Sequence, residues 1–242
     1  MDIMTTTELI IAALIVAAAV VAQAGTGSGF GIVSSPLLLM ISPQLVPGPL
    51  LLVSVVVMLF VSWQNRRGLR HVDLKLAIAG CVPGAVAGLC VLPLLNGKWT
   101  GMIVGGLVVA SVLTGLKGFR IPQNRFSLFT AGLLGGVLGT VASTSGPPLV
   151  VVYRSEDPDR YRANLSLFFL VSSLVSLLAL AGAGSFGAEE LLLTGWLLPG
   201  VALGALASRP VVKRISAAAI RPAALSLCLV AGVSLLMKGA LA

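Results

Sequence analysis

The sequence predicts an all-α integral membrane protein made of two inverted repeats, each a re-entrant or broken-helix hairpin followed by three transmembrane helices. Composition, the lengths of the apolar segments and the placement of basic residues predict this fold class. Of the 242 residues, 57% are hydrophobic and 10% are charged, and the mean hydropathy is +1.05. A soluble domain carries roughly a quarter of its residues as charged side chains. The composition therefore excludes a soluble enzyme, a disordered chain and a disulfide scaffold.

Apolar segments follow one another along the whole chain, separated by charge, proline or glycine. They cover residues 9–24, 30–41, 46–63, 74–95, 99–116, 126–142, 147–153, 163–184, 191–207 and 223–237. None alternates with a period of two, which favours helices over a membrane β-barrel. Because a helix needs about 20 residues to cross the hydrocarbon region, the segments 30–41 and 147–153 are too short to span.

Each short segment is joined to the segment before it by a break rich in small residues. The sequence GTGSGFG at 25–31 connects the first pair, and STSG at 143–146 connects the second. Each pair is predicted to form a hairpin of helical pieces.

The basic residues set the expected orientation, because short cytoplasmic loops retain lysine and arginine. They cluster as Arg66, Arg67, Arg70 and Lys75, then Lys117, Arg120 and Arg125, then Arg209, Lys213, Arg214 and Arg221. Placing all three clusters inside requires the stretch 126–153 to enter and leave on the cytoplasmic side. The hairpin 9–41 then enters from the outside, and both termini are predicted to be periplasmic. All but two of the 16 basic residues, Lys98 and Lys238, lie inside in this topology.

Internal similarity supports a duplication. The pattern PGxxxG begins at Pro83 and again at Pro199, and Lys-Gly closes the last span of each half at 117 and 238. The two hairpin sequences align when they are started from Gly25 and Gly139. We expect one transmembrane domain over 1–242, with repeat 1 at 1–119 and repeat 2 at 120–242. Inverted repeats with discontinuous helices are typical of secondary transporters.

The breaks are the candidate site, because a helix that begins inside the membrane presents unpaired amides and a positive dipole end to an anion. Nearby hydroxyl groups add neutral donors. The predicted binding residues are Gly25, Thr26, Gly27, Ser28, Gly29, Phe30, Gly31, Thr140, Ser143, Thr144, Ser145, Gly146 and Pro147. Arg162, just before an apolar helix, is predicted to guide the anion toward them. No carboxylate lies well inside a span, which favours uniport or coupling through the protonation of the anion itself.

Four stretches resemble the sulfite exporter TauE/SafE family of membrane permeases. They are GTGSGFGIVSSPLLL, LLGGVLGTVASTSGPPLVVVY, the YRANL that follows, and the loop NRRGLRHVDLKL. The resemblance implies a transporter, most simply an exporter, of sulfite, sulfoacetate or other organosulfonates in the bacterial inner membrane. It also implies that the anion is held at the two breaks.

Other functions stay open at this point, namely an anion channel, an uptake permease or a membrane scaffold. An intramembrane serine hydrolase is disfavoured, because Ser145 has no base at depth and the single histidine, His71, falls in a loop. Cys81, Cys90 and Cys228 match no zinc spacing, so neither a metal nor a cofactor is predicted. The net charge of +8 is explained by cytoplasmic loops rather than by nucleic acid. The expected partners are a small anion and the lipid bilayer, and the oligomeric state is left open.

Overall fold

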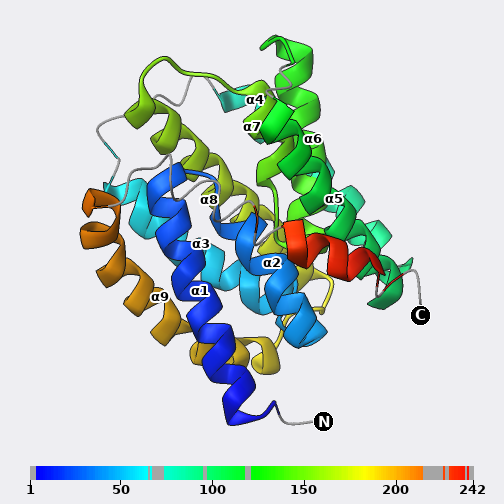
Figure 1. The fold of residues 1–242 in the computed structure, drawn as a ribbon. Coiled ribbons are helices and arrows are strands. Elements are labelled where there is room, and N and C mark those ends of the chain that lie inside the picture. The colour runs from blue at the N-terminus through cyan, green and yellow to red at the C-terminus, as the bar shows by residue number, and fades with distance from the viewer. Residues whose placement is uncertain are drawn as a thin grey trace.

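The computed structural model describes residues 4–64, 66, 74–94, 97–117, 121–214, 226, 229–237 and 239. Helices make up almost all of this part of the chain, and it contains no strand (Figure 1). The helices are α1 (Thr6–Thr26), α2 (Phe30–Ile41), α3 (Gly48–Gln64), α4 (Lys75–Val91), α5 (Gly97–Lys117), α6 (Arg125–Ala142), α7 (Gly146–Val152), α8 (Pro158–Gly182) and α9 (Ala188–Arg214), with short 3₁₀ turns at Pro43–Leu45 and Leu92–Leu94.

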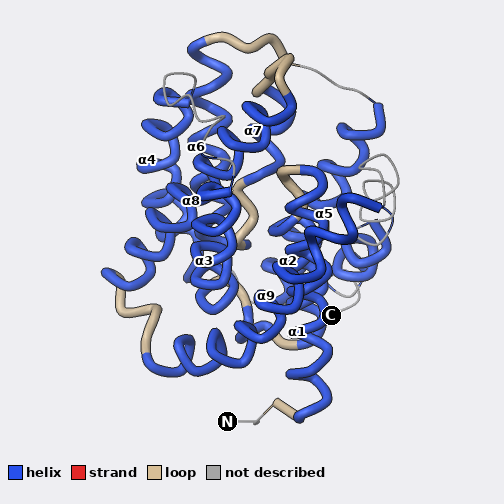
Figure 2. Tube along the Cα trace, turned by 90° about the vertical axis from the view of Figure 1, so that its left-hand side faces the viewer, coloured by secondary structure: helices blue, strands red, loops and turns tan. Residues whose placement is uncertain are grey.

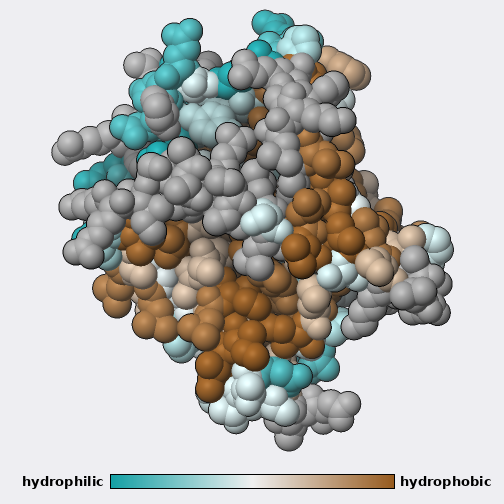
Figure 3. All heavy atoms as spheres, viewed as in Figure 1, coloured by the Kyte–Doolittle hydropathy of each residue, from teal (hydrophilic) through white to brown (hydrophobic). Residues whose placement is uncertain are grey.

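Among the described residues, five helices are long and apolar enough to cross a membrane, namely α1, α4, α6, α8 and α9. Their outward faces carry large apolar side chains such as Leu178, Leu192 and Leu206, which are about 70% exposed. Figure 3 shows hydrophobic residues over the middle and lower part of one face and hydrophilic residues gathered mainly at its upper end. A helix that is apolar on all sides is typical of a membrane span. The chain is a multi-pass helical membrane protein.

Local chemistry explains where several helices begin. Thr5 and Glu8 form a capping box at the start of α1, in which the Thr5 amide donates to the Glu8 carboxylate at 2.8 Å. Asn124 caps α6 by accepting from the Ser127 amide at 2.8 Å, and Asp157 caps α8. These caps satisfy amides that a helix start leaves without intrahelical partners.

Two helices extend further than the apolar segments predict. The helix α8 begins at Pro158 rather than near residue 163, so Arg160 and Arg162 lie in its first turns and not in a loop. The helix α9 continues to Arg214, so Arg209 is helical as well. Charged residues can extend a helix beyond the apolar region, so hydropathy alone places the start of α8 too late and the end of α9 too early. Arg67, Arg70, His71, Arg120, Arg221 and Cys228 lie outside the described residues.

The second hairpin, α6 with α7, starts and finishes at the same end of the molecule. The Ile121 amide donates to the Val151 carbonyl at 3.5 Å, and the Arg154 amide donates to the Gln123 side chain at 2.9 Å. These bonds join the segment before α6 to the last turn of α7 and to the segment after it. From that end, α8 runs for 25 residues to the opposite end, where α9 begins.

The first hairpin, α1 with α2, starts and finishes at the end where α9 begins. Gly48, at the start of α3, lies against the Glu190 side chain in the first turn of α9. Gly200 and Gly204 of α9 face Ala13 and Ala17 of α1 in the same order, so α1 and α9 run parallel. The two hairpins therefore enter the bundle from opposite ends. Figure 2 shows loop segments at both ends of the molecule and also midway along it.

Glycines allow two helix pairs to approach closely, and both pairs join the two halves of the chain. A Cβ on Gly84 of α4 would collide with the Leu133 carbonyl of α6, and a Cβ on Gly200 of α9 would collide with the Ala13 carbonyl of α1. Small residues permit this backbone contact in membrane helices. Gly84 and Gly200 occupy the same position of the two PGxxxG patterns. The repeated motif therefore makes an equivalent close helix–helix contact in each half. The helices α3 and α8 pack against each other between these pairs.

Candidate functional site

The break between α1 and α2 is held by Gln23, a side chain that is 1% exposed. Its side-chain amide group donates to the Gly27 carbonyl at 2.9 Å, and its side-chain oxygen accepts from the Phe30 amide at 3.0 Å. Gly27 ends α1 in the left-handed conformation with φ +79°, which glycine adopts without strain. One glutamine therefore connects the last turn of α1 to the first residue of α2.

The break between α6 and α7 is held by hydroxyl groups. Ser143 ends α6 in the left-handed conformation with φ 53°, and its hydroxyl donates to the Pro47 carbonyl at 2.8 Å. Gly27 and Ser143 thus perform the same task in the two halves. They are separated by the same number of positions as Pro83 and Pro199. An alignment started from Gly25 and Gly139 is therefore out of register with the structure by two residues.

The two breaks are in direct contact. The Thr144 hydroxyl lies 3.0 Å from the carbonyls of both Gly31 and Ala142, and the Ser35 hydroxyl donates to the Ala142 carbonyl at 2.6 Å. A Cβ on Gly31 would lie 2.9 Å from the Ser143 carbonyl oxygen. Residues from opposite halves of the sequence therefore meet within one small region inside the bundle.

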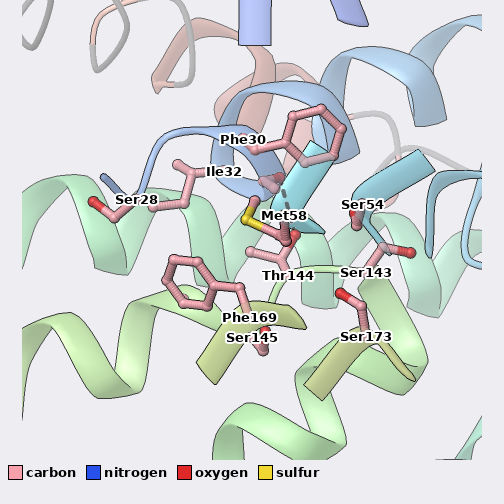
Figure 4. A pocket seen from close by; sticks show the side chains of 12 residues that line it. Ser28, Phe30, Ile32, Ser54, Met58, Ser143, Thr144, Ser145, Phe169 and Ser173 are labelled. Atoms are coloured by element: carbon pink, nitrogen blue, oxygen red, sulfur yellow. Dashed lines mark hydrogen bonds between the residues drawn. The ribbon is translucent and has the colours of Figure 1, made fainter. Parts of the chain in front are cut away.

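A small pocket lies at this meeting point. Both breaks contribute to it, together with α3 and α8. Its described lining residues are Ser28, Phe30, Gly31, Ile32, Ser54, Met58, Ser143, Thr144, Ser145, Gly146, Phe169 and Ser173. Figure 4 shows Phe30 and Ile32 on one side of the pocket and Phe169, Ser145 and Ser173 on the other.

The hydroxyl groups of the pocket fall into two classes. Those of Ser54, Ser143 and Thr144 donate to the backbone carbonyls of Leu50, Pro47 and Gly31, at 2.8, 2.8 and 3.0 Å. A hydroxyl has one proton, so these three present only lone pairs to a ligand.

The hydroxyls of Ser28, Ser145 and Ser173 make no hydrogen bond within the described part of the chain. Ser145 and Ser173 are 8% and 6% exposed. These three hydroxyls remain available to donate to an anion.

The first turn of α2 adds backbone donors. The Phe30 amide is used by Gln23, and the Val33 amide donates to the Gly29 carbonyl at 3.0 Å. The Gly31 and Ile32 amides have no hydrogen-bond acceptor among the described residues, and both residues line the pocket. Unpaired amides at the start of a 12-residue helix attract negative charge. The seven-residue α7 has fewer aligned peptide groups to add.

The structure brings seven of the predicted site residues together around the pocket. They are Ser28, Phe30, Gly31, Ser143, Thr144, Ser145 and Gly146. Gly25, Thr26, Gly27, Gly29 and Pro147 flank the breaks without lining the pocket. Thr140 lies apart, fully buried, where its hydroxyl contacts the Ser176 hydroxyl at 2.9 Å and the Gly136 carbonyl at 3.1 Å.

Arg162 lies beside the first break rather than in the pocket. Its Cγ would be 3.0 Å, and its Cα 3.3 Å, from a Cβ on Gly27. The side chain is half-buried, and its guanidinium makes no hydrogen bond or ion pair within the described residues. Arg162, Phe169 and Ser173 recur along α8 at a spacing that places them on one helix face. Arg162 therefore contacts Gly27, the residue before Ser28, and lies at the rim of the pocket.

Sequence reasoning missed Gln23, Ile32, Ser54, Met58, Phe169 and Ser173. Gln23 and Ser54 did carry a signal, because each is a polar residue inside a long apolar run. Ser173 lies in a segment of α8 with several serines, which does not single it out. Met58 and Phe169 are apolar residues in apolar helices, and their place at the pocket comes from the packing of α3 on α8.

The fold and the site together define a class, that of multi-pass helical membrane proteins in which two interrupted helices from opposite ends meet at one pocket. A family model described as sulfite exporter TauE/SafE matches residues 11–235. The chain belongs to this family and is a membrane transporter. It is also similar to the probable sulfite/organosulfonate exporter TauE of Cupriavidus necator, with 27% identity over 180 residues, which is 70% of each chain. No solved structure gives a significant match.

Proposed function

We propose that this protein exports small sulfur-containing anions, such as sulfite or organosulfonates, across the bacterial inner membrane. The anion binds in the pocket between the breaks 27–29 and 143–145. The observation that carries the proposal is that these breaks, far apart in sequence, line one pocket with free amide and hydroxyl donors. The family and the name of its Cupriavidus relative support the chemical class of the substrate.

The same proposal includes alternating access by two inverted repeats, 1–119 and 120–242. Three features support it: the hairpins enter from opposite ends, Gly27 and Ser143 both end a helix in the left-handed conformation, and Gly84 and Gly200 make equivalent contacts. The pairs α1 with α9 and α4 with α6 each join the two halves. Rocking of one half against the other would expose the pocket to each side in turn.

Neutral donors suit a site that must release its ligand. A buried arginine holds an anion strongly and is costly to place in a membrane. Hydroxyl and amide groups bind more weakly, each by about 0.5–1.5 kcal/mol net when neutral and more toward an ion. A small number of such bonds gives specificity while the anion still dissociates.

The test is flux in proteoliposomes containing the purified protein and labelled sulfite or sulfonate. We expect saturable, anion-selective flux, and we expect Gly27→Leu and Gly146→Leu to abolish it while membrane insertion is retained. Normal transport by both variants would exclude the breaks as the site. Ohmic conductance without saturation would identify a channel instead.

A further inference from the structure

The pocket contains donors without a formal positive charge. None of the described residues that line it is acidic, basic or a histidine. The available donors are the hydroxyls of Ser28, Ser145 and Ser173 and two amides at the start of α2. Ser145 and Ser173 are more than nine-tenths buried, and both line the pocket. Their unpaired hydroxyls are therefore positioned to donate to a ligand inside the protein. The described lining thus suits an anion but supplies no counter-ion.

The positive potential that the pocket does supply is small. The N-terminus of a helix is equivalent to about half an elementary charge. Among the described helices, α2 is the one of full length that begins here. Ser54, Ser143 and Thr144 have already donated their protons to backbone carbonyls. The oxygen lone pairs of these three hydroxyls would repel a second negative charge on the ligand.

Arg162 does not change this balance. Its Cα and Cγ pack beside Gly27, and it is not among the residues that line the pocket. A cation at the rim raises the local concentration of every anion and speeds association. It does not neutralise a charge that has entered the pocket beyond Ser28.

The cost of moving an ion out of water rises with the square of its charge, and buried ions without counter-ions are strongly disfavoured. Resting on the proposed function, we infer that the pocket selects monoanions over dianions. The transported form of sulfite is then bisulfite, and monoanionic sulfonates are carried in preference to sulfonates that also bear a carboxylate. Bisulfite thereby carries its own proton, which agrees with the absence of an acidic side chain from the described lining.

The test compares two sulfonates of nearly equal size, isethionate with one negative charge and sulfoacetate with two. Flux of each into proteoliposomes is measured with the membrane potential clamped at zero. We expect isethionate to have a kcat/KM at least about tenfold higher. Sulfoacetate flux equal to or greater than that of isethionate would overturn the inference and leave the proposed function standing. No saturable flux of isethionate, sulfoacetate or sulfite would overturn the proposed function itself.

Sulfite gives a second readout with a single solute. Lowering the pH through the neutral range converts sulfite to bisulfite, so flux at fixed total concentration should rise in proportion to the bisulfite fraction. Isethionate flux should stay constant over the same range, which controls for effects of pH on the protein. Sulfite flux that rises with pH would contradict the inference.

Two variants locate the origin of the selectivity. Arg162→Gln should lower kcat/KM for both solutes, and more for sulfoacetate, because a cation at the rim attracts a dianion about twice as strongly as a monoanion. The preference for isethionate should therefore grow, whereas its loss in this variant would assign the selection to Arg162. Met58→Lys places a cation in the lining and should shift the ratio toward sulfoacetate. If folded Met58→Lys protein keeps the wild-type ratio, pocket charge does not set the preference. The wild-type comparison stands even if this variant does not fold.

Discussion

The side-chain oxygen of Gln23 accepts the backbone amide of Phe30 at 3.0 Å, across the break between α1 and α2. The amide nitrogen of the same side chain donates to the Gly27 carbonyl at 2.9 Å. A single buried glutamine therefore satisfies one group on each side of the break. This arrangement uses the Phe30 amide and leaves those of Gly31 and Ile32 free for a ligand.

Replacing Gln23 by methionine, which has a similar shape, should destabilise the protein and reduce flux. The Phe30 amide and the Gly27 carbonyl would be left buried without partners, at a cost of roughly 1–3 kcal/mol each. Thermal unfolding in detergent and proteoliposome flux measure the two effects. The matched control is Gln44→Met, because Gln44 is exposed. Equal unfolding temperatures for the two variants would show that Gln23 does not hold the break.

Ser173→Ala should raise KM by about tenfold with little change in the unfolding temperature. The variant removes a hydroxyl whose proton is free for the anion, and a hydrogen bond to a charged group contributes about 1.5–3 kcal/mol. Ser54→Ala is the control, since Ser54 lines the same pocket but donates to the Leu50 carbonyl at 2.8 Å. A larger KM change in Ser54→Ala than in Ser173→Ala would refute the division of the hydroxyls into two classes.

Substitutions at Gly146 should grade transport by side-chain size. A Cβ at this position would lie 3.4 Å from the Phe169 ring and 4.0 Å from the Ser28 carbonyl oxygen, both ordinary contacts. Gly146→Ala should therefore fold and transport with reduced affinity, while Gly146→Leu fills the pocket and abolishes flux. Flux assays on protein checked by size-exclusion chromatography measure this. Full activity of the leucine variant would place the substrate elsewhere.

Gly200→Leu should prevent α9 from packing on α1 and greatly reduce the yield of folded protein. A Cβ at Gly200 already collides with the Ala13 carbonyl, and overpacking of this kind costs about 1–3 kcal/mol or more. Gly195→Leu on the same helix is the control, because Gly195 is exposed with no described atom within 4 Å of the added carbon. The yield of monodisperse protein and its unfolding temperature should fall only for Gly200→Leu.

The fold class and the positions of the breaks were predictable, because they follow from local chemistry. Glycine at 27 permits the left-handed end of α1, and the apolar segments are long enough to require membrane helices. The ends of α8 and α9 were less predictable. Their polar first or last turns, which include Arg162 and Arg209, continue a helix beyond the apolar segment that hydropathy detects.

The composition of the pocket was only partly predictable. Which hydroxyls can still donate depends on carbonyls that are close in space and, for two of the three, far along the chain, as with Ser143 and Pro47 or Thr144 and Gly31. Phe169 and Ser173 reach the site because α8 packs on α3 beside both breaks. No spacing rule contains that information. The sequence analysis grouped Thr140 with the other hydroxyl residues of the site. In the structure its hydroxyl is hydrogen-bonded to the Ser176 hydroxyl, away from the pocket.

The central claim, that an anion is held between the two breaks, is tested most directly by locating a bound ligand. A crystal structure with 2-bromoethanesulfonate, a monoanion with an anomalous scatterer, would mark the position. We predict a bromine peak in the pocket beside Met58 and Phe169, with the sulfonate oxygens about 3 Å from the hydroxyls of Ser145 and Ser173. A bromine peak outside the pocket, with density for water alone between the breaks, would contradict this account.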